Sequence, residues 1–191
     1  MTSSSGDIVG PIPTGVDADS YDRLRRRVLW SLPTGLYVLG TRAGHQRNLM
    51  TVSWVTQVAQ EPKMVGVGVE CGSRTHELLI GGGVFTLSLL ARRDRALVRR
   101  FVKPVQDVDI DEETGMGAMN DVPVRSASTG APFLDVAVAW IDCEIRHTLP
   151  LGSHSWFVGE VVDVGANEPE SPVDDDGRVL RMEDTRMNYG G

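Results

Sequence analysis

The alternation of apolar and polar residues predicts a chain built mainly of β-strands. From residue 50 to residue 58 the side chains alternate, with mostly apolar residues on one side and mostly polar residues on the other. A period of two with one polar side is typical of a half-covered strand. Pro62 ends this segment, and residues 64–70 predict the next strand. Gly66 and Gly68 share one face of it, which favours close approach of another group to the backbone.

Further strands are predicted at residues 36–41, 84–90, 136–148 and 154–164. Residues 42–47 contain a glycine and predict a hairpin turn between two of the strands. The chain therefore has six or more strands that are mostly joined by short turns. Strands in such succession favour a barrel, because a barrel removes exposed sheet edges. Regular strand–helix alternation, as in a doubly wound parallel sheet, is missing from the pattern.

Two helices and one helix-like stretch interrupt the strands. Tyr21, Leu24 and Val28 recur at helical spacing, with Asp19 or Ser20 as the candidate cap and Pro33 as the stop. The second helix is predicted at 73–80, with Ser73 as its cap and three glycines at its end. Residues 92–103 form a basic, helix-like stretch, and residues 104–132 have no clear period and predict a long loop.

Composition and charge narrow the class of protein. The 191 residues are 41% hydrophobic and 24% charged, which suits one globular domain. The formal net charge of −7 argues against nucleic-acid binding. No apolar run approaches the ~20 residues of a membrane span, and residues 1–7 lack the pattern of a secretory signal, so we expect a cytoplasmic protein. Cys71 and Cys143 are expected to be buried thiols.

The expected organisation has three parts. Residues 1–17 are rich in serine, glycine and proline and predict a flexible arm. Residues 18–165 form the barrel domain, and residues 166–191 form an acidic extension and tail. The four histidines are scattered and no zinc-binding helix motif is present, so no metal is expected. No phosphate loop is present, and no dinucleotide fingerprint opens a helix.

Two segments carry candidate chemistry. Ser73, Arg74 and Thr75 lie where a strand passes into a helix, and free N–H groups at a helix start attract an anion such as a phosphate. The alternative is a plain helix cap. In residues 48–54, small polar side chains on one strand face would let a flat ring reach the backbone, as a flavin requires. The alternative here is a polar strand side that faces solvent.

Together these segments resemble the flavin reductase-like proteins with a flavin mononucleotide (FMN)-binding split barrel. The resemblance covers roughly residues 20–165 and rests on the order of these motifs: Pro33-Thr34-Gly35-Leu36-Tyr37-Val38-Leu39, Asn48 to Trp54 with Thr56, Glu61-Pro62, Ser73-Arg74-Thr75-His76, Arg99-Arg100-Phe101, and Gly152-Ser153-His154 through Gly159-Glu160-Val161. It implies a six-stranded antiparallel split β-barrel with peripheral helices that forms a homodimer.

The resemblance also implies the site. Ser73, Arg74 and Thr75 would hold the flavin phosphate, and His154 would stand near the nicotinamide or the reacting flavin edge as the catalytic residue. Ser153 replaces the acid that the family often has before this histidine. The remaining cofactor-binding residues would be Thr34, Asn48, Met50, Thr51, Val52, Ser53, Trp54 and Phe101.

The implied activity is hydride transfer from NADH or NADPH to FMN, with FAD also possible, and then to an acceptor such as free flavin for a partner monooxygenase. Three alternatives stay open. The first is an FMN-binding electron carrier or ferric reductase without that activity. The second is an oxidase of a pyridoxine-type phosphate ester, and the third is a flavin-free interaction module. The sequence does not distinguish NADH from NADPH.

Overall fold

The computed structural model describes residues 10–167, 179–185 and 187. The chain divides into two compact units, residues 1–33 with 186–191, and residues 34–185, which are described separately. Most of the predicted arm and of the acidic extension lies outside the described residues, so the predicted boundaries at 17 and 165 stay predictions.

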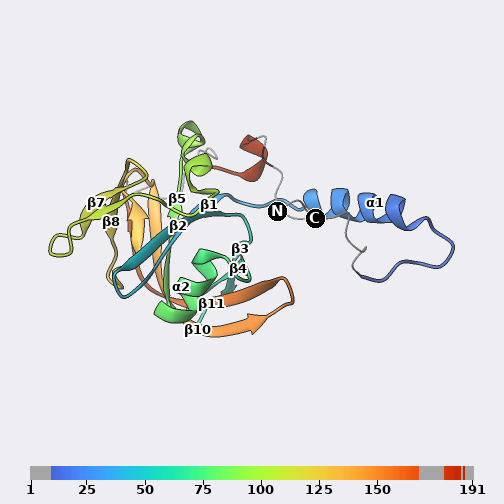
Figure 1. Ribbon diagram of the computed structural model, residues 1–191, viewed down its shortest axis with the longest axis horizontal. Coiled ribbons are helices and arrows are strands. Elements are labelled where there is room, and N and C mark those ends of the chain that lie inside the picture. The colour runs from blue at the N-terminus through green and yellow to red at the C-terminus, as the bar shows by residue number, and fades with distance from the viewer. Residues whose placement is uncertain (1–9, 168–178, 186, 188–191) are drawn as a thin grey trace. The chain divides into compact units, whose positions relative to one another are not determined.

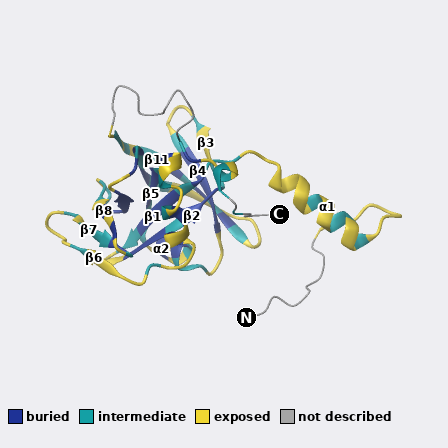
Figure 2. Cartoon of the chain, turned by 90° about the horizontal axis from the view of Figure 1, so that it is seen from above, coloured by how far each residue is buried: buried dark blue, intermediate teal, exposed yellow. Residues whose placement is uncertain are grey.

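The first unit contains helix α1, Ala18–Trp30. Its N-cap is Asp17, whose side chain accepts a hydrogen bond of 3.0 Å from Ser20 N. The cap therefore lies before both Asp19 and Ser20, the two predicted candidates, because the residue that reaches the third N–H must stand outside the first turn. No residue of α1 is buried (Figure 2). No helix in the described ranges has the length and apolar character that crossing a bilayer requires.

The second unit is built on an antiparallel sheet of seven strands in the order β2-β1-β5-β10-β11-β4-β3 (Figure 1). The strands are β1 Tyr37–Ala43, β2 Gln46–Val52, β3 Val55–Ala59, β4 Met64–Glu70, β5 Val84–Leu89, β10 Ala139–Pro150 and β11 His154–Ala166. The turn between β1 and β2 is shorter than the predicted 42–47, since Ala43 already pairs with Gln46.

The predicted single strand at 50–58 is in fact two strands, and this changes the strand count. Val55 N donates to Ser53 O across 3.0 Å, which turns the chain sharply between β2 and β3. These two strands are the opposite edges of the sheet order, yet only Ser53 and Trp54 separate them. The sheet must therefore curl back on itself at this point. The prediction of six barrel strands is corrected, because the main sheet has seven strands. Among the described residues, no ladder of hydrogen bonds joins its two edge strands, β2 and β3.

Residues 104–132 are not the predicted loop. They contribute most of a second antiparallel sheet, in the order β6-β7-β8-β9, with β6 Val108–Ile110, β7 Met116–Met119, β8 Val122–Ser126 and β9 Pro132–Leu134. Strands of three to five residues are too short to show a period. The sequence did contain one local signal, the pair Asn120 and Asp121, since these residue types favour tight hairpin turns. Both adopt positive φ in the turn between β7 and β8.

The small sheet packs on the main sheet through β9. The Thr86 hydroxyl donates to Pro132 O, and Leu134 N donates to Ser88 Oγ across 3.0 Å. Thr86 and Ser88 are fully buried residues of β5. Gly40 of β1 lies so close to Pro132 O that a Cβ atom there would overlap it. Polar side chains on one face of β5 therefore satisfy the edge of the second sheet.

A helix forms where the sequence predicts it at 73–80, whereas the predicted helix-like stretch 92–103 does not form one helix. Helix α2, Arg74–Gly82, has the predicted cap Ser73 and ends at Gly83, which has φ 68°. The stretch 92–103 forms two short 3-10 helices, η1 Arg92–Asp94 and η2 Leu97–Phe101, rather than one helix. A continuous helix would place Arg95, Arg99 and Lys103 on one face, where like charges four residues apart destabilise it. A third 3-10 helix, η3, spans Met182–Asp184.

The core of the second unit lies inside the curled sheet and is closed on one side by α2. It joins apolar side chains from β1, β2, β4, β5, β11 and α2, namely Leu39, Val52, Val65, Val67, Val69, Leu79, Phe85, Leu87 and Phe157 with Cys143 (Figure 2). This packing fixes β2, β4, β11 and α2 against one another, and the candidate site lies where these elements meet.

Candidate functional site

The start of α2 has the free donors that an anion requires. The Ser73 hydroxyl donates to Glu70 O across 2.8 Å and accepts from His76 N across 3.2 Å, so Ser73 caps α2, and its contact with a phosphate stays a prediction. The next two N–H groups, those of Arg74 and Thr75, donate to no group in the described part of the chain. The Arg74 guanidinium is partly exposed, and among the described residues its ion pair is with Glu77, at 3.1 Å.

Thr75 is tied to strand β2 by Asn48. The Asn48 side-chain amide nitrogen donates to Thr75 Oγ1 across 2.9 Å, and its oxygen accepts from Val105 N across 2.9 Å. Asn48 and Thr75 are 3% and 1% exposed. The structure therefore brings together two of the predicted segments, residues 48–54 and 73–75.

The polar side of β2 is buried and does not face solvent, so that alternative is wrong. The Thr51 hydroxyl donates to Val98 O of η2. Ser53 is 2% exposed, and its hydroxyl has no hydrogen-bond partner among the described residues. A buried hydroxyl without a partner costs about 1–3 kcal/mol, so Ser53 fits a group that brings its own polar atoms.

Trp54 and His154 meet beside the end of β2. Their ring centroids are 4.7 Å apart with the planes tilted by 51°. His154 opens β11 and pairs with Glu70, whose carbonyl accepts the bond from Ser73. The predicted catalytic histidine thus lies at the same end of the sheet as the start of α2. Its Nδ1 atom is 2.9 Å from the hydroxyl of Ser153, which replaces the expected acid.

The glycines of β4 make room for aromatic side chains. A Cβ atom on Gly66 would overlap the indole of Trp156, and one on Gly68 would lie 3.1 Å from the ring of Trp54. This confirms the close approach predicted for these two positions. Because Trp54 rests over Gly68, its position depends on a residue without a side chain.

A second polar group at this end was not predicted. His76 Nε2 lies 2.8 Å from the hydroxyl of Ser155, which lies 3.6 Å from Cys71 Sγ. Ser155 follows His154 directly, so strand alternation points it to the other face. Cys71 is exposed, contrary to prediction, because it lies in the turn before α2. Cys143 is buried as predicted, and its burial raises the pKa of that thiol to about 12.

The remaining predicted residues lie in the packed interior or just before β1. Val52 and Phe101 are 2% and 0% exposed, and Met50 packs against the same core. Thr34 is partly buried, and its carbonyl accepts from Met182 N across 3.1 Å. Their roles at a flavin stay predictions.

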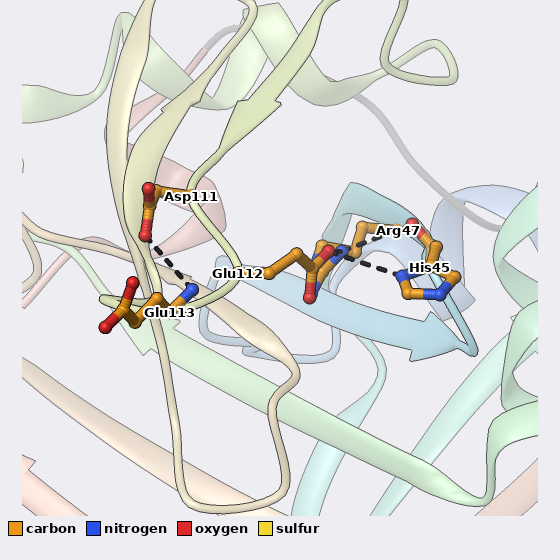
Figure 3. Close-up of polar contacts among 5 residues, drawn as sticks. All are labelled: His45, Arg47, Asp111, Glu112 and Glu113. Atoms are coloured by element: carbon orange, nitrogen blue, oxygen red, sulfur yellow. Dashed lines mark hydrogen bonds and ion pairs between the residues drawn. The ribbon is translucent and has the colours of Figure 1, made fainter.

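An ion pair between the sheets was also not predicted (Figure 3). The Arg47 side chain, 4% exposed, donates through both terminal nitrogens to Glu112, at 2.7 and 2.9 Å, and His45 Nδ1 is 3.6 Å from the same carboxylate. Hydrogen bonding from Arg47 lowers the pKa of Glu112. Asp111 closes the turn by accepting from Glu113 N and Thr114 N, and the bonds from Thr114 lower the pKa of Asp111.

Comparison with known proteins gives one family. Residues 29–182 match the model of the flavin reductase like domain. The chain is 32% identical over 159 residues to the NADH-dependent flavin reductase StyB of Pseudomonas fluorescens, covering 82% of this chain and 85% of that protein. It is 30% identical over 174 residues to an NADPH-flavin oxidoreductase of Streptomyces viridifaciens, covering 89% and 87%.

The chain is also similar to a solved structure. The styrene monooxygenase flavin reductase of Pseudomonas putida S12 aligns with a TM-score of 0.60 and 29% identity, covering 76% of this chain and 87% of that one. The family match over residues 29–182 includes the main sheet and α2, the elements that form the candidate site.

Proposed function

Because the chain belongs to the flavin reductase like domain family, it is an NAD(P)H-dependent flavin reductase, and we propose that FMN binds where β2, α2 and β11 meet. The observation that carries this placement is the set of unused polar groups at one end of the main sheet. The Ser53 hydroxyl and the N–H groups of Arg74 and Thr75 have no partner in the described chain.

The residues present fit the cofactor. A phosphate at the start of α2 would accept from the two free N–H groups and lie near the Arg74 guanidinium. The ring would lie along residues 51–54, where the Ser53 hydroxyl offers a hydrogen bond. FMN is favoured over riboflavin because only the phosphate uses the donors of α2.

When bound, the flavin supplies the redox centre that accepts a hydride from NADH or NADPH. The chain's own residues bind and orient the reactants and exclude water. His154 is the residue proposed to contact the nicotinamide, since it packs against Trp54 and is held at Nδ1 by Ser153. The hydroxyl of Ser153 fixes the ring without adding the negative charge that an acid would bring.

The electron acceptor is proposed to be flavin that is passed to a partner monooxygenase. This proposal rests on the solved relative named as a styrene monooxygenase flavin reductase. The alternative, a carrier or ferric reductase, differs in one measurable way, because such a protein would bind flavin and would not be reduced by a nicotinamide.

A homodimer and a cytoplasmic location are kept as proposals. Helix α1 supports the homodimer, because its 13 residues carry exposed apolar side chains at Leu24, Val28 and Leu29 and none is buried. A helix of this length is marginal in water unless an apolar face is covered. Light scattering after size-exclusion chromatography measures the mass of the assembly.

The experiment that tests the function is a visible spectrum of the purified protein with FMN, followed by addition of NADH or NADPH without oxygen. Loss of the oxidised flavin band is the expected result, and it identifies the donor. A bound flavin that stays oxidised with both donors would favour the carrier. A protein that takes up no FMN would contradict the placement.

A further inference from the structure

We propose that Asn48 is a positioning residue for flavin phosphate binding, and that it acts by fixing the direction of the Thr75 hydroxyl. The inference rests on the proposed function, since it assumes that the phosphate lies at the start of α2. It assigns Asn48 no contact with the flavin, which differs from the direct role that the family resemblance implies.

The direction of the Asn48 amide follows from one backbone group. Val105 N is a hydrogen-bond donor and nothing else, so the side-chain atom 2.9 Å from it must be the amide oxygen. The amide nitrogen therefore faces Thr75. Oxygen and nitrogen of an amide are otherwise assigned from their surroundings, and here the surroundings leave one choice.

The direction of the Thr75 hydroxyl follows in turn. The Asn48 amide nitrogen can only donate, so Thr75 Oγ1 accepts at 2.9 Å, and the hydroxyl hydrogen must point elsewhere. No acceptor for that hydrogen lies among the described contacts of Thr75. Both residues are at least nine-tenths buried, at 3% and 1% exposed, so water does not satisfy them freely.

The free hydrogen has one suitable destination. Thr75 is the second residue of α2, and helical side chains lean toward the N-terminus of their helix. The hydroxyl therefore lies over the first turn, beside the unused N–H groups of Arg74 and Thr75 itself. An anion there would receive three donors that the fold has oriented before binding.

Asn48 has a second role in this arrangement. It connects three segments that are far apart in the sequence: strand β2, the start of α2, and the segment after η2 that contains Val105. A tie of this kind restricts the hydroxyl and lowers the entropy cost of binding. A hydroxyl that rotated freely would donate to the phosphate for only part of the time.

The test measures Kd for FMN and for riboflavin by fluorescence quenching, in the wild-type protein and in Asn48→Ala, Thr75→Val and the double variant. Thr75→Val should lower the preference for FMN over riboflavin by about 10- to 100-fold, the effect of one hydrogen bond to a charged group. Asn48→Ala should lower it in the same direction, and the double variant should lose no more than Thr75→Val alone.

Asn48→Asp is the second variant, for use where the alanine variant fails to fold. A carboxylate still accepts from Val105 N, yet it cannot donate to Thr75, so the Thr75 hydrogen turns toward it and away from the phosphate. The FMN preference should fall by at least as much as in Asn48→Ala. Riboflavin affinity reports damage to the ring site. If the role of Asn48 were purely structural, its variants would lower the affinities for riboflavin and for FMN equally.

The matched control is Thr41→Val. Thr41 is the cross-strand partner of Asn48, is fully buried, and donates its hydroxyl to Val84 O of β5 across 2.8 Å. It should lower stability and leave the FMN preference unchanged.

Two results would overturn the inference while leaving the proposed function intact. One is a normal FMN preference in Asn48→Ala and Asn48→Asp. The other is losses from Asn48→Ala and Thr75→Val that add, which would mean that Asn48 acts on the phosphate independently of Thr75. A wild-type protein that does not bind flavin would instead contradict the proposed function itself.

Discussion

The imidazole of His154 packs against the indole of Trp54, with ring centroids 4.7 Å apart and planes tilted by 51°. The two residues are separated by one hundred positions in the sequence. Trp54 lies in the turn at which the main sheet curls back, and His154 opens the strand β11 beside it. The contact therefore joins the edge of the proposed flavin site to the proposed nicotinamide site.

His154→Ala should separate flavin binding from flavin reduction. We expect the Kd for FMN to change by less than about threefold, because the phosphate donors of α2 are untouched. The rate of reduction by the preferred nicotinamide should fall about 10- to 100-fold through loss of orientation. Anaerobic stopped-flow absorbance measures the rate.

The matched control for this variant is His147→Ala, an exposed histidine on β10. It should reduce flavin at the wild-type rate. If His154→Ala also binds FMN normally and is reduced at the wild-type rate, the proposed role of His154 is wrong.

Arg74→Ala should weaken FMN binding about tenfold and leave riboflavin binding nearly unchanged, because only FMN carries the phosphate. The Arg74 side chain is 38% exposed, so salt should reduce its contribution. Fluorescence titration of both ligands at low and high salt measures these effects.

Glu77→Gln is the control for Arg74, since Glu77 is the carboxylate that pairs with the guanidinium at 3.1 Å. Removing its charge should leave FMN binding unchanged or make it tighter. Equal losses for FMN and riboflavin in Arg74→Ala would remove Arg74 from the phosphate site.

Glu112→Gln should lower stability in a way that depends on pH. Hydrogen bonding from Arg47 lowers the pKa of Glu112 below its ordinary value of 4.5. The folded state thus binds fewer protons than the unfolded state, so the pair stabilises the fold above pH 4.5 and loses this effect as pH falls through the lower folded pKa. The urea midpoint of the variant should be lower than that of the wild type at pH 7, and this difference should shrink below pH 4.5.

Glu113→Gln is the matched control, because the next side chain is exposed and makes no ion pair with Arg47. It should leave the urea midpoint nearly unchanged both at pH 7 and below pH 4.5. A midpoint difference for Glu112→Gln that stays constant with pH would mean that the Arg47–Glu112 pair is not formed in solution.

Local features of the site were predictable from the sequence, because they depend on neighbouring residues. Ser73 caps α2 as predicted, since a cap needs only a serine three positions before a free N–H. Room beside Gly66 and Gly68 was also predictable, since a missing side chain on one strand face leaves space for a ring.

The features that were missed depend on residues distant in the sequence. The turn at Ser53 and Trp54 breaks a pattern that alternates without interruption, and tertiary closure of the sheet decides it. The ion pair of Arg47 with Glu112 joins residues 65 positions apart, and no local period indicates it. The ties from Asn48 to Thr75 and from His76 to Ser155 were missed for the same reason.

Gly40→Ala tests the packing of the small sheet on the main sheet. A Cβ atom at this position would overlap the backbone oxygen of Pro132, which already accepts from Thr86 and cannot move as a flexible side chain would. Either β9 shifts away from β1 or the strand distorts, and overpacking of this kind costs about 1–3 kcal/mol. Urea unfolding measures the free energy, and hydrogen exchange at Leu134 N reports whether its bond to Ser88 opens.

Gly81→Ala gives the comparison for Gly40→Ala, because an added Cβ there meets only the Ala43 Cβ at an ordinary 3.5 Å, and alanine favours a helix. That variant should be neutral, or more stable by up to about 1 kcal/mol. If Gly40→Ala proves as stable as Gly81→Ala and Leu134 stays protected, β9 does not lie against β1 in solution. If Gly40→Ala is destabilised and Leu134 exchanges faster, the second sheet is held by this close approach, and its polar bonds to β5 depend on a glycine in β1.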